Sequence, residues 1–429
     1  MLTIVFWDVI LLIVLLMFSV PLPYCFGGAL LFMSFFGDVS MKSMMLWAFD
    51  QMINPVLLAS PMFILAGILM GGSGIAKKLL DFVDVFVGHI RGGLGVVCCV
   101  TCAIIGAISG SGFTGVAATG PIMIPRMVEQ GYPRGFSTAL LSVSSILGLL
   151  IPPSAIMILY GWVTETSILA CFLSTLGPGL LIMALLSIVN LVMSKKFPLK
   201  LETREVIKER RKEIVPRTFS ALPALMMPVI VLGGIYGGIF TATEAAAVSA
   251  LYAIPVGFLV YKGFSGGNFF PLLRDSASAI GSIMTMILFC LMLSQTYVML
   301  KVPQAIVEIV YSLTDNTTVL LILINLFLFV VGMVVNDATG MILVAPLLLP
   351  LMKQIDRPII CGDHGVNLAM GGQLHPTQAS SSRHAHGNCS FQEILGPTLV
   401  LLIFGYVPVV FLTTFWPPLA LYIPRLLGF

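Results

Sequence analysis

Glycine, serine and threonine residues interrupt two otherwise apolar stretches that lie far apart in the chain. The first reads "AISGSGFTG" over residues 107–115, and the second reads "VVNDATG" over residues 334–340. Glycines let the backbone turn sharply, which leaves carbonyl and hydroxyl oxygens free to act as ligands. Such hard oxygens suit Na⁺, and the N–H groups at the start of a helix suit an anion. Both stretches are therefore candidate binding sites; for the first, a packing seam of small residues is the alternative.

Asp337 is the strongest single candidate for a charged ligand. It follows Asn336 directly after an apolar run that begins near Val319. A carboxylate at membrane depth is costly and marks a functional site when a cation or donor lies near it. A loop carboxylate at the aqueous end of the apolar run is the alternative. Glu165 and Glu244 stand beside threonine or serine residues, which is typical of helix starts.

The two stretches begin a longer pattern that occurs twice. Thr-Gly and prolines return at matching intervals in "TGVAATGPIMIPRMVEQGYP" (114–133) and "TGMILVAPLLLPLMKQIDRP" (339–358). Each copy then carries two further landmarks, which are "LGLLIPPS" (147–154) and "LGPGLLI" (176–182) in the first and "NLAMGGQLHP" (367–376) and "LGPTLVL" (395–401) in the second. We interpret this order as an internal duplication.

The prolines of the first copy are expected to interrupt helices. A proline inside a helix removes one hydrogen bond and clashes with the preceding turn, so Pro121, Pro125, Pro152 and Pro153 are each expected to break or kink their segments. Backbone groups freed in a membrane are tolerated only where they are buried in protein or face a wet cavity. Duplicated halves with interrupted helices are how many secondary transporters build a site near the middle of the bilayer.

The elements that position these residues are expected to be membrane helices. The chain has 429 residues, 58% hydrophobic and 10% charged, with a mean hydropathy of +1.05. Such a chain cannot cover itself with a water-soluble surface, and its net charge of +3 is too small to suggest a nucleic acid as partner. Because the apolar runs are continuous rather than alternating, we expect an all-α integral membrane protein and not a barrel.

About ten to twelve spans are expected, since about 20 apolar residues cross the bilayer as a helix. The apolar runs cover residues 2–36, 55–70, 94–108, 140–159, 167–193, 221–240, 245–261, 277–300, 319–335 and 394–427. No Lys or Arg precedes Lys42, so the amino terminus is expected to be a retained span rather than a removed signal.

A basic segment lies near the midpoint of the chain. Residues 195–217 hold nine of the 22 Lys and Arg residues, so this segment is expected to be cytoplasmic, as a solvated linker or as a site for anionic lipid or regulation. We expect a first repeat over residues 1–194, a cytoplasmic linker over 195–217 and a second repeat over 218–429. Between Leu94 and Leu159 the only basic residues are Arg126 and Arg134, which are expected to flank a loop at the membrane surface. For Arg126, contact with a substrate carboxylate is the alternative to reaching the interface.

The ordered motifs resemble the large membrane subunit of the tripartite ATP-independent periplasmic (TRAP) transporters. Those motifs are "SGSGFTGVAATGPIMIPRMVEQGYP", "LGLLIPPSAIMILYGWVTETSI", "FLSTLGPGLLI", "GGIYGGIFTATEAAAVSALYA", "NDATGMILVAPLLLP", "VNLAMGGQ" and "SFQEILGP". The resemblance implies a secondary transporter and not an enzyme. It implies a multi-pass protein of the bacterial inner membrane that works with a small membrane subunit and a periplasmic substrate-binding protein. The cargo would be an organic acid (a C4-dicarboxylate, a sialic acid, or a sugar or keto acid), driven by Na⁺ with no other cofactor.

The resemblance also implies an elevator-type fold of two inverted repeats, each with a re-entrant helical hairpin and a broken helix. Sodium and substrate would bind in the first repeat at Ser109, Gly110, Ser111, Gly112, Thr114, Gly148, Pro152 and Pro153. In the second repeat they would bind at Asn336, Asp337, Thr339, Gly340, Asn367, Gly371, Gly372 and Gln373.

One segment departs from the family pattern. After "VNLAMGGQ" the chain reads "LHPTQASSSRHAHGNC" (374–389), which is too polar to partition into lipid as a half-helix. Three interpretations compete: a polar insertion lining an aqueous site, a locally altered reading frame that would leave an inactive copy of such a subunit, or a metal site. The metal site, which a metal-dependent intramembrane enzyme would use, would draw on His364, His375, His384, His386 and Cys389, whose spacing matches no closed ligand set.

Overall fold

The structure is a computed structural model that describes residues 2–18, 20–200, 212–314, 316–335, 337–355 and 389–428. These residues form helices and, among themselves, no strand. The helices before residue 200 are α1 (Leu2–Met17), α2 (Leu22–Phe36), α3 (Met41–Met52), α4 (Pro55–Ser73), α5 (Ile75–Val87), α6 (Gly93–Ser109), α7 (Gly112–Gln130), α8 (Arg134–Ser145), α9 (Leu147–Leu150), α10 (Ala155–Val163) and α11 (Ile168–Ser194). Those after residue 211 are α13 (Ile214–Tyr236), α14 (Ala242–Pro255), α15 (Gly266–Met299), α16 (Val302–Leu313), α17 (Thr317–Val334), α18 (Asp337–Gln354), α21 (Phe391–Leu401), α22 (Val407–Phe415) and α23 (Pro418–Leu426), with π-helices η1 (Val256–Val260) and η2 (Leu402–Tyr406).

The helices have the length and composition of membrane spans. Among the described residues, six helices are long and apolar enough to cross a bilayer: Pro55–Ser73, Ile168–Ser194, Ile214–Tyr236, Ala242–Val260, Gly266–Met299 and Gln392–Phe415. The pair Arg134–Leu150 and Ala155–Val163, bent by 44° at its break, counts as a seventh if it is one span. The expected all-α integral membrane protein is confirmed, while the count of about ten to twelve spans stays a prediction.

Prolines act differently at different places in the chain. The apolar run over residues 2–36 holds two helices, because Pro21 lacks an N–H and disfavours helical backbone in the residue before it. Pro121 and Pro125, in contrast, lie inside a continuous α7, so neither breaks the helix, and a kink at either residue stays a prediction. Both lie on an exposed face of α7 together with Ala117, whose carbonyl loses its N–H partner at Pro121. Neighbouring groups or water can satisfy such a carbonyl without breaking the helix.

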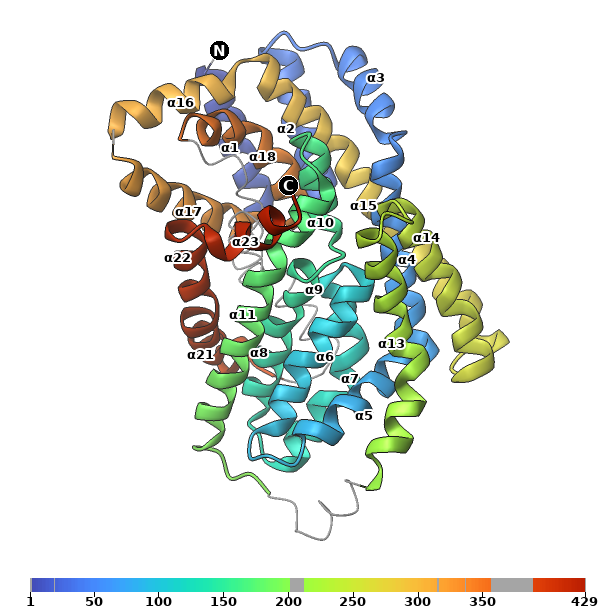
Figure 1. The fold of residues 1–429 in the computed structure, drawn as a ribbon. Helices are drawn as coiled ribbons and strands as arrows, with labels where there is room; N and C mark the ends of the chain where they lie inside the picture. The colour runs from blue at the N-terminus through green and yellow to red at the C-terminus, as the bar shows by residue number, and fades with distance from the viewer. Residues whose placement is uncertain are drawn as a thin grey trace.

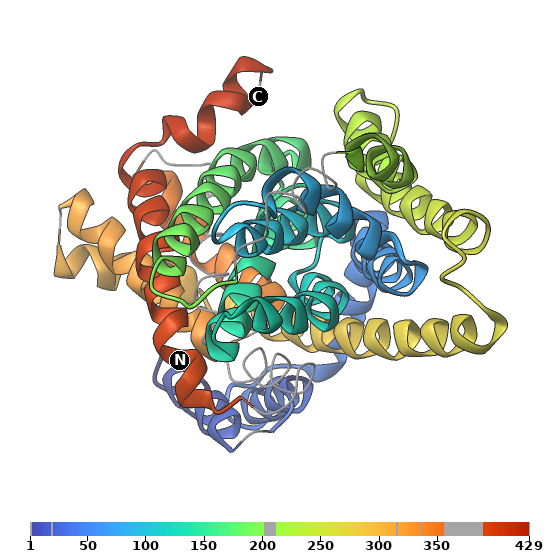
Figure 2. The same cartoon turned by 90° about the horizontal axis from the view of Figure 1, so that it is seen from below.

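Buried apolar side chains form three clusters. The hairpin core joins α6 to α11 with α21 and α22, through residues that include Val97, Met123, Leu140, Leu150, Ile182 and Leu401. The α15 core joins α1, α2, α15 and α18 through Leu12, Phe26, Ile287 and Ile342, and the α4 core joins α4, α5, α13 and α14 through Leu69, Ala76, Met227 and Ala253. In Figure 2, α6 to α8 lie in the middle of the molecule, and α1, α2, α13, α14 and α15 lie around them.

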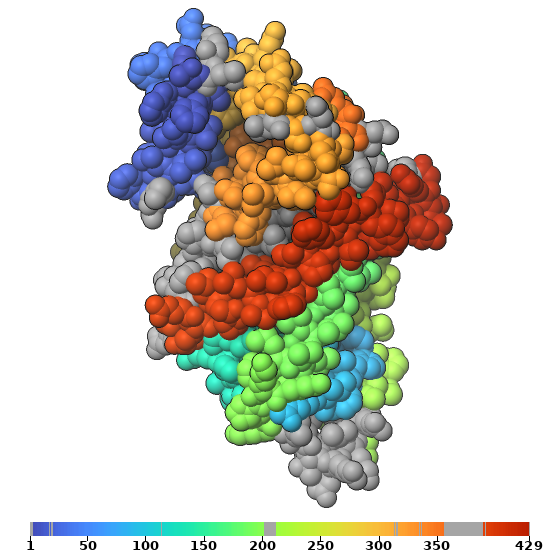
Figure 3. All heavy atoms as spheres, turned by 90° about the vertical axis from the view of Figure 1, so that its left-hand side faces the viewer, coloured from blue at the N-terminus to red at the C-terminus, as the bar shows by residue number. Residues whose placement is uncertain are grey.

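The two ends of the molecule hold different connections. α11 ends and α13 begins at one end, near α5, whereas α16 lies at the opposite end (Figure 1). α21, η2, α22 and α23 run as a diagonal band across one face, over α11 (Figure 3). Since the basic segment follows α11, the positive-inside tendency predicts that the end near α5 faces the cytoplasm.

Candidate functional site

The first candidate stretch forms the tip of a helical hairpin. α6 ends at Ser109, and α7 begins at Gly112. Between them Gly110 has a φ of 60°, a left-handed conformation that glycine adopts without a Cβ clash. The Ser109 hydroxyl donates to the Ser111 carbonyl oxygen at 3.3 Å and accepts from the Ser111 N–H at 3.4 Å. The tip is thus a tight turn whose hydroxyl is held by its own backbone.

Both ends of this hairpin lie at the same end of the molecule. Before α6, Arg91 donates to the carbonyls of Lys195 and Phe197 at 3.3 and 3.2 Å. After α7, the Lys200 N–H donates to the Gln130 carbonyl at 2.8 Å. Because residues 195–200 follow α11, both ends lie beside the basic segment, and the chain enters and leaves on one side. The two helices therefore form a hairpin whose open end lies beside the basic segment, and its re-entrant character stays a prediction.

The break expected near Pro152 and Pro153 is present. α9 ends at Leu150, and α10 begins at Ala155. Ser154 joins the two sides, since its hydroxyl donates to the Leu149 carbonyl and accepts from the Met157 N–H. The break is thus covered by one buried serine, which satisfies a carbonyl of α9 and caps α10.

The hairpin tip and the broken helix touch through their backbones. The Ala155 N–H donates to the Gly110 carbonyl at 3.3 Å. A Cβ at Gly106 would lie 2.0 Å from the Gly148 Cα, and a Cβ at Gly148 would lie 3.0 Å from the Ser111 carbonyl oxygen. No side chain fits between the two elements here. The structure therefore brings the first-copy candidates together at one place.

α4 covers the same tip. A Cβ at Gly67 would lie 2.7 Å from the Ser109 Cβ and 2.7 Å from the Thr114 hydroxyl oxygen. A Cβ at Gly112 would lie 3.2 Å from the Ser145 carbonyl oxygen of α8. Hydroxyls and carbonyls of three elements thus gather within a short range, all of them neutral. Neutral oxygens of this kind can coordinate Na⁺.

The second candidate stretch places a buried acid at the start of a helix. Asp337 is the first residue of α18, its side chain is 6% exposed, and its Oδ1 has no hydrogen-bond partner among the described residues. The hydroxyl of Thr339, two residues later in the same turn, is buried and likewise without a partner there. A buried carboxylate oxygen needs a cation or a donor to offset its lost hydration. The start of α18 is therefore suited to hold a cation.

α15 supports this helix start from the side. Cys290 donates to the Thr339 carbonyl at 3.5 Å, and Ser294 donates to the Ile342 carbonyl at 3.2 Å. The Ile342 carbonyl would normally accept from residue 346, which is Pro346 and has no N–H. Ser294 thus replaces a hydrogen bond that the proline removes. α18 packs extensively against α15 and α10 and only slightly against α17.

Several candidates of the second copy lie outside the described residues: Asn336, Asn367, Gly371, Gly372 and Gln373. The same holds for residues 374–388 and for His364, so the interpretations of the polar segment are not tested. Within the ranges that are described, no group of three or more His, Cys, Asp or Glu side chains could hold a metal ion.

Sequence reasoning missed two further buried acids and misplaced one arginine. Asp8 in α1 is fully buried and accepts from the Tyr297 hydroxyl of α15 at 2.7 Å. The sequence could have indicated this residue, because Asp8 interrupts a long apolar run. Asp84 in α5 accepts from Arg126 at 3.0 Å. Arg126 therefore lies on α7 as an ion-pair partner and not beside a surface loop, because α7 continues to Gln130.

Comparison with known proteins shows similarity along most of the chain. The family model for the DctM component of tripartite ATP-independent periplasmic transporters matches residues 9–381. That match ends inside the polar segment 374–389. A C4-dicarboxylate TRAP transporter large permease protein of Pseudomonas aeruginosa is 34% identical over 333 residues, which are 77% of this chain and 76% of that protein.

A longer relative and a solved structure extend the similarity. The isethionate TRAP transporter permease protein DctMQ of Oleidesulfovibrio alaskensis is 32% identical over 377 residues, which are 87% of this chain but only 59% of that protein. The crystal structure of the Alcanivorax borkumensis YdaH transporter superposes with a TM-score of 0.59 at 14% identity, covering 88% of this chain and 89% of that one. The latter similarity concerns the fold alone.

Proposed function

This chain belongs to the family of DctM components of tripartite ATP-independent periplasmic transporters, multi-pass proteins of the inner membrane, and from this premise we propose that it carries an organic acid inward together with Na⁺. The observation that supports this most is the contact between two interrupted helices, where the Ala155 N–H meets the Gly110 carbonyl at 3.3 Å. Interrupted helices that meet inside a membrane protein expose the backbone groups that bind ions and substrate.

We propose one Na⁺ site at each tip. In the first repeat (1–194) the ligands would be oxygens near Ser109, Ser111 and Thr114, beside the break at Pro152 and Pro153. In the second repeat (218–429) Asp337 and Thr339 would contribute oxygens that have no hydrogen-bond partner among the described residues. Asn336 and the residues from Asn367 to Gln373 would complete that site. The acid would bind between the tips, with Na⁺ supplying the positive charge that the described first tip lacks.

The cargo is proposed as an organic acid, and its identity is left to the binding protein. The relatives' names cover a C4-dicarboxylate and isethionate, both organic anions. The partners proposed for this chain are a small membrane subunit and a periplasmic substrate-binding protein. The DctMQ relative, of which this chain covers 59%, supports the small membrane subunit as a partner.

The test is uptake into proteoliposomes that hold this chain with its small subunit. Labelled C4-dicarboxylate, sialic acid and isethionate are offered with the binding protein encoded beside this chain, under an inward Na⁺ gradient or with K⁺ in its place. Uptake of one acid that needs both Na⁺ and the binding protein is expected. Uptake that ignores either would contradict the proposal.

An inactive copy is the second candidate, because residues 374–389 depart from the family pattern. It predicts a complex that assembles with its small subunit yet takes up no acid under any gradient. Replacing residues 374–389 with the corresponding segment of the Pseudomonas aeruginosa relative would then restore uptake. If the native chain is active, this candidate is excluded.

A further inference from the structure

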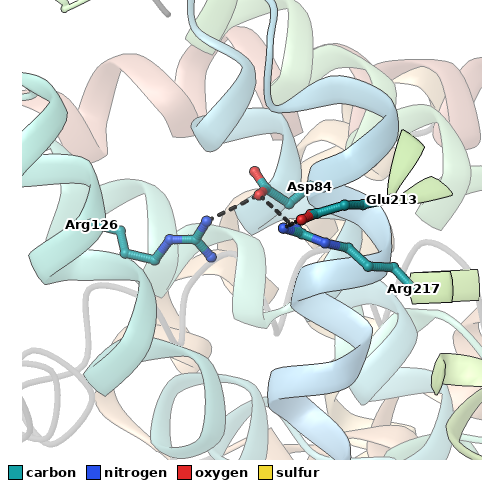
Figure 4. A network of polar contacts seen from close by, with 4 residues as sticks. All are labelled: Asp84, Arg126, Glu213 and Arg217. Carbon is teal, nitrogen blue, oxygen red and sulfur yellow. Dashed lines mark hydrogen bonds and ion pairs between the residues drawn. The ribbon is translucent and has the colours of Figure 1, made fainter. Parts of the chain in front are cut away.

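Two ion pairs from different helices meet at Asp84 (Figure 4). On one side, Arg126 of α7 donates to the Asp84 Oδ2 at 3.0 Å. On the other side, Arg217 of α13 lies 3.7 Å from the same oxygen and also pairs with Glu213 one turn earlier. The cluster therefore links an arm of the first hairpin, the helix before that hairpin and α13, which begins within the basic segment.

The three side chains differ in their contact with solvent. The Asp84 side chain is 1% exposed, whereas those of Arg126 and Arg217 are 34% and 32% exposed. A buried carboxylate is costly without a cationic partner. A guanidinium that is one-third exposed can regain water when it leaves, so its contact is easier to give up. Asp84 must keep a partner, while either arginine can move.

α5 lies between two packed bodies. Ile75, Ala76 and Leu79 of its first turns belong to the α4 core with α13 and α14. Leu80 and Val83, farther along α5, belong to the hairpin core with α6 and α7. α13 packs extensively against α5 and α14 and more lightly against α6, and its Val231 and Ile235, far from Arg217, also belong to the hairpin core. The link from Arg217 to Asp84 thus joins the first turn of α13 to the last turn of α5, at the opposite end of α13 from Val231 and Ile235.

The contact between Arg217 and Asp84 can open without leaving any of the four charged groups of the cluster without an ion-pair partner. If Arg217 leaves Asp84, Arg126 still pairs with Asp84, and Glu213 still pairs with Arg217. Each of these pairs sums to zero charge. The contact that opens is the longer one, at 3.7 Å, while the hydrogen bond at 3.0 Å stays. Opening therefore costs little, which is what a reversible contact requires.

We propose that the Arg217–Asp84 contact is a latch that holds the first hairpin against the α13–α14 block at the cytoplasmic end, and that it opens when the hairpin moves during transport. This proposal rests on the proposed function, because it assumes that the hairpin moves. The latch belongs to one repeat: α16, which precedes α17 as α5 precedes α6, has Glu308 as its one charged residue.

The experiment measures the distance between the two bodies by electron paramagnetic resonance. Spin labels are placed at Val128→Cys of α7 and Phe219→Cys of α13, both of which are exposed positions. The doubly labelled complex in lipid is measured without a further change and with Arg217→Gln, Arg217→Lys or Glu213→Gln. The parent without the two introduced cysteines, treated with the same spin label, gives the signal of the native cysteines. Arg217→Gln is expected to raise the population of the longer distance about two- to fivefold, since a part-exposed pair is this weak.

Two further variants separate a latch from general damage. Arg217→Lys keeps the positive charge, so most of the population at the shorter distance should remain. Glu213→Gln removes the group that competes for Arg217, so it should lower the longer-distance population, a change of opposite sign that mere destabilisation does not produce. The matched control is Arg274→Gln, since Arg274 lies 3.7 Å from Asp275 in a pair that is 85% and 67% exposed; it should change nothing.

An unchanged distance distribution in Arg217→Gln overturns the latch, whatever the uptake assay reports. So does a shift of the same sign in Arg217→Gln and Glu213→Gln. If the parent complex shows no Na⁺-dependent uptake while Arg217→Gln and Glu213→Gln shift in opposite directions, the proposed function fails and the contact still holds the two bodies together.

Discussion

The tip between α6 and α7 and the start of α18 hold their polar atoms in different ways. At the first tip the Ser109 hydroxyl bonds to Ser111, and the Gly110 carbonyl accepts from Ala155, so neutral groups satisfy one another. At the start of α18 the Asp337 Oδ1 and the Thr339 hydroxyl have no such partner among the described residues. The polar atoms of the first tip are thus partnered without an ion, whereas the second holds a buried carboxyl oxygen that a cation could partner.

Because of this difference, we expect the two tips to respond differently to the removal of Na⁺. A site made of neutral, mutually bonded oxygens should keep its shape when Na⁺ is removed. A site with a buried carboxylate should loosen, because the charge is then uncompensated. Na⁺ should therefore act on stability mainly through α18, and the variants below break or sharpen this contrast.

The largest effect is expected from Asp337→Asn. It should weaken Na⁺ binding by roughly 2 to 5 kcal/mol, which is more than about 30-fold, because it removes one partner of a buried charge pair. In Na⁺-free buffer the same variant should be at least as heat-stable as the parent, since the unpaired charge is gone. Uptake against Na⁺ concentration and thermal unfolding check the two parts. Asp275→Asn, at a position 67% exposed, is the control; an unchanged Na⁺ dependence would remove Asp337 from the site.

Gly148→Ala should disturb the first tip next most strongly. The added Cβ would lie 2.8 Å from the Gly106 Cα and 3.0 Å from the Ser111 carbonyl oxygen, so the hairpin and the broken helix must separate. Overpacking of this kind costs about 1 to 3 kcal/mol. Thermal unfolding of the purified complex measures it. Gly281→Ala, where a Cβ meets nothing within 4 Å, should not destabilise; equal behaviour of the two would refute the close contact.

Ser109→Ala should have a smaller effect than Asp337→Asn. It removes one neutral ligand and the bonds to Ser111, worth about 0.5 to 1.5 kcal/mol, or about two- to twelvefold in the half-saturating Na⁺ concentration. Ser282→Ala is the matched control, because that exposed serine bonds only to the carbonyl of Ser278 on its own helix. If Ser109→Ala lost as much as Asp337→Asn, the contrast between the tips would not hold.

The smallest change in stability is expected from removing the hydrogen bond by which Ser294 supports α18. Ser294→Ala should destabilise by about 0.5 to 1.5 kcal/mol, because the Ile342 carbonyl loses its donor. Pro346→Ala supplies an N–H that can reach the same carbonyl, so Ser294→Ala should cost little in that background. Thermal unfolding of the parent, both single variants and the double variant gives the coupling between them. Additive losses would show that Ser294 does not replace the proline's missing bond.

The sequence predicts the parts of the site that depend on local chemistry. Gly110 turns the chain because glycine tolerates a positive φ, and Pro152 and Pro153 end a helix because they lack an N–H. Both features act within a few residues, so the positions of the tip and of the break follow from the residue types alone. The all-α membrane fold follows from composition in the same way, and the family resemblance is confirmed.

The parts that sequence reasoning missed depend on neighbours far away in the chain. Pro121 and Pro125 lie inside an unbroken helix. Whether a proline breaks a membrane helix depends on what surrounds the carbonyl that it frees, which no local rule states. The partners of Asp84 come from α7 and α13, and only the packed structure shows that they meet. The cap that Ser154 forms at the start of α10 could have been predicted, since a serine after two prolines and before an apolar run is typical of a helix cap.

The bond between Asp8 and Tyr297 has a consequence for biosynthesis. It joins residues 289 positions apart, so the carboxylate of α1 is made long before its donor. At about 5 to 20 residues per second, ribosomes need roughly 15 to 60 s to reach Tyr297. During that interval α1 must enter the membrane with an acid for which Tyr297 does not yet exist. The first helix is thus made earliest, yet its Asp8 hydrogen bond can form only after Tyr297 has been synthesised.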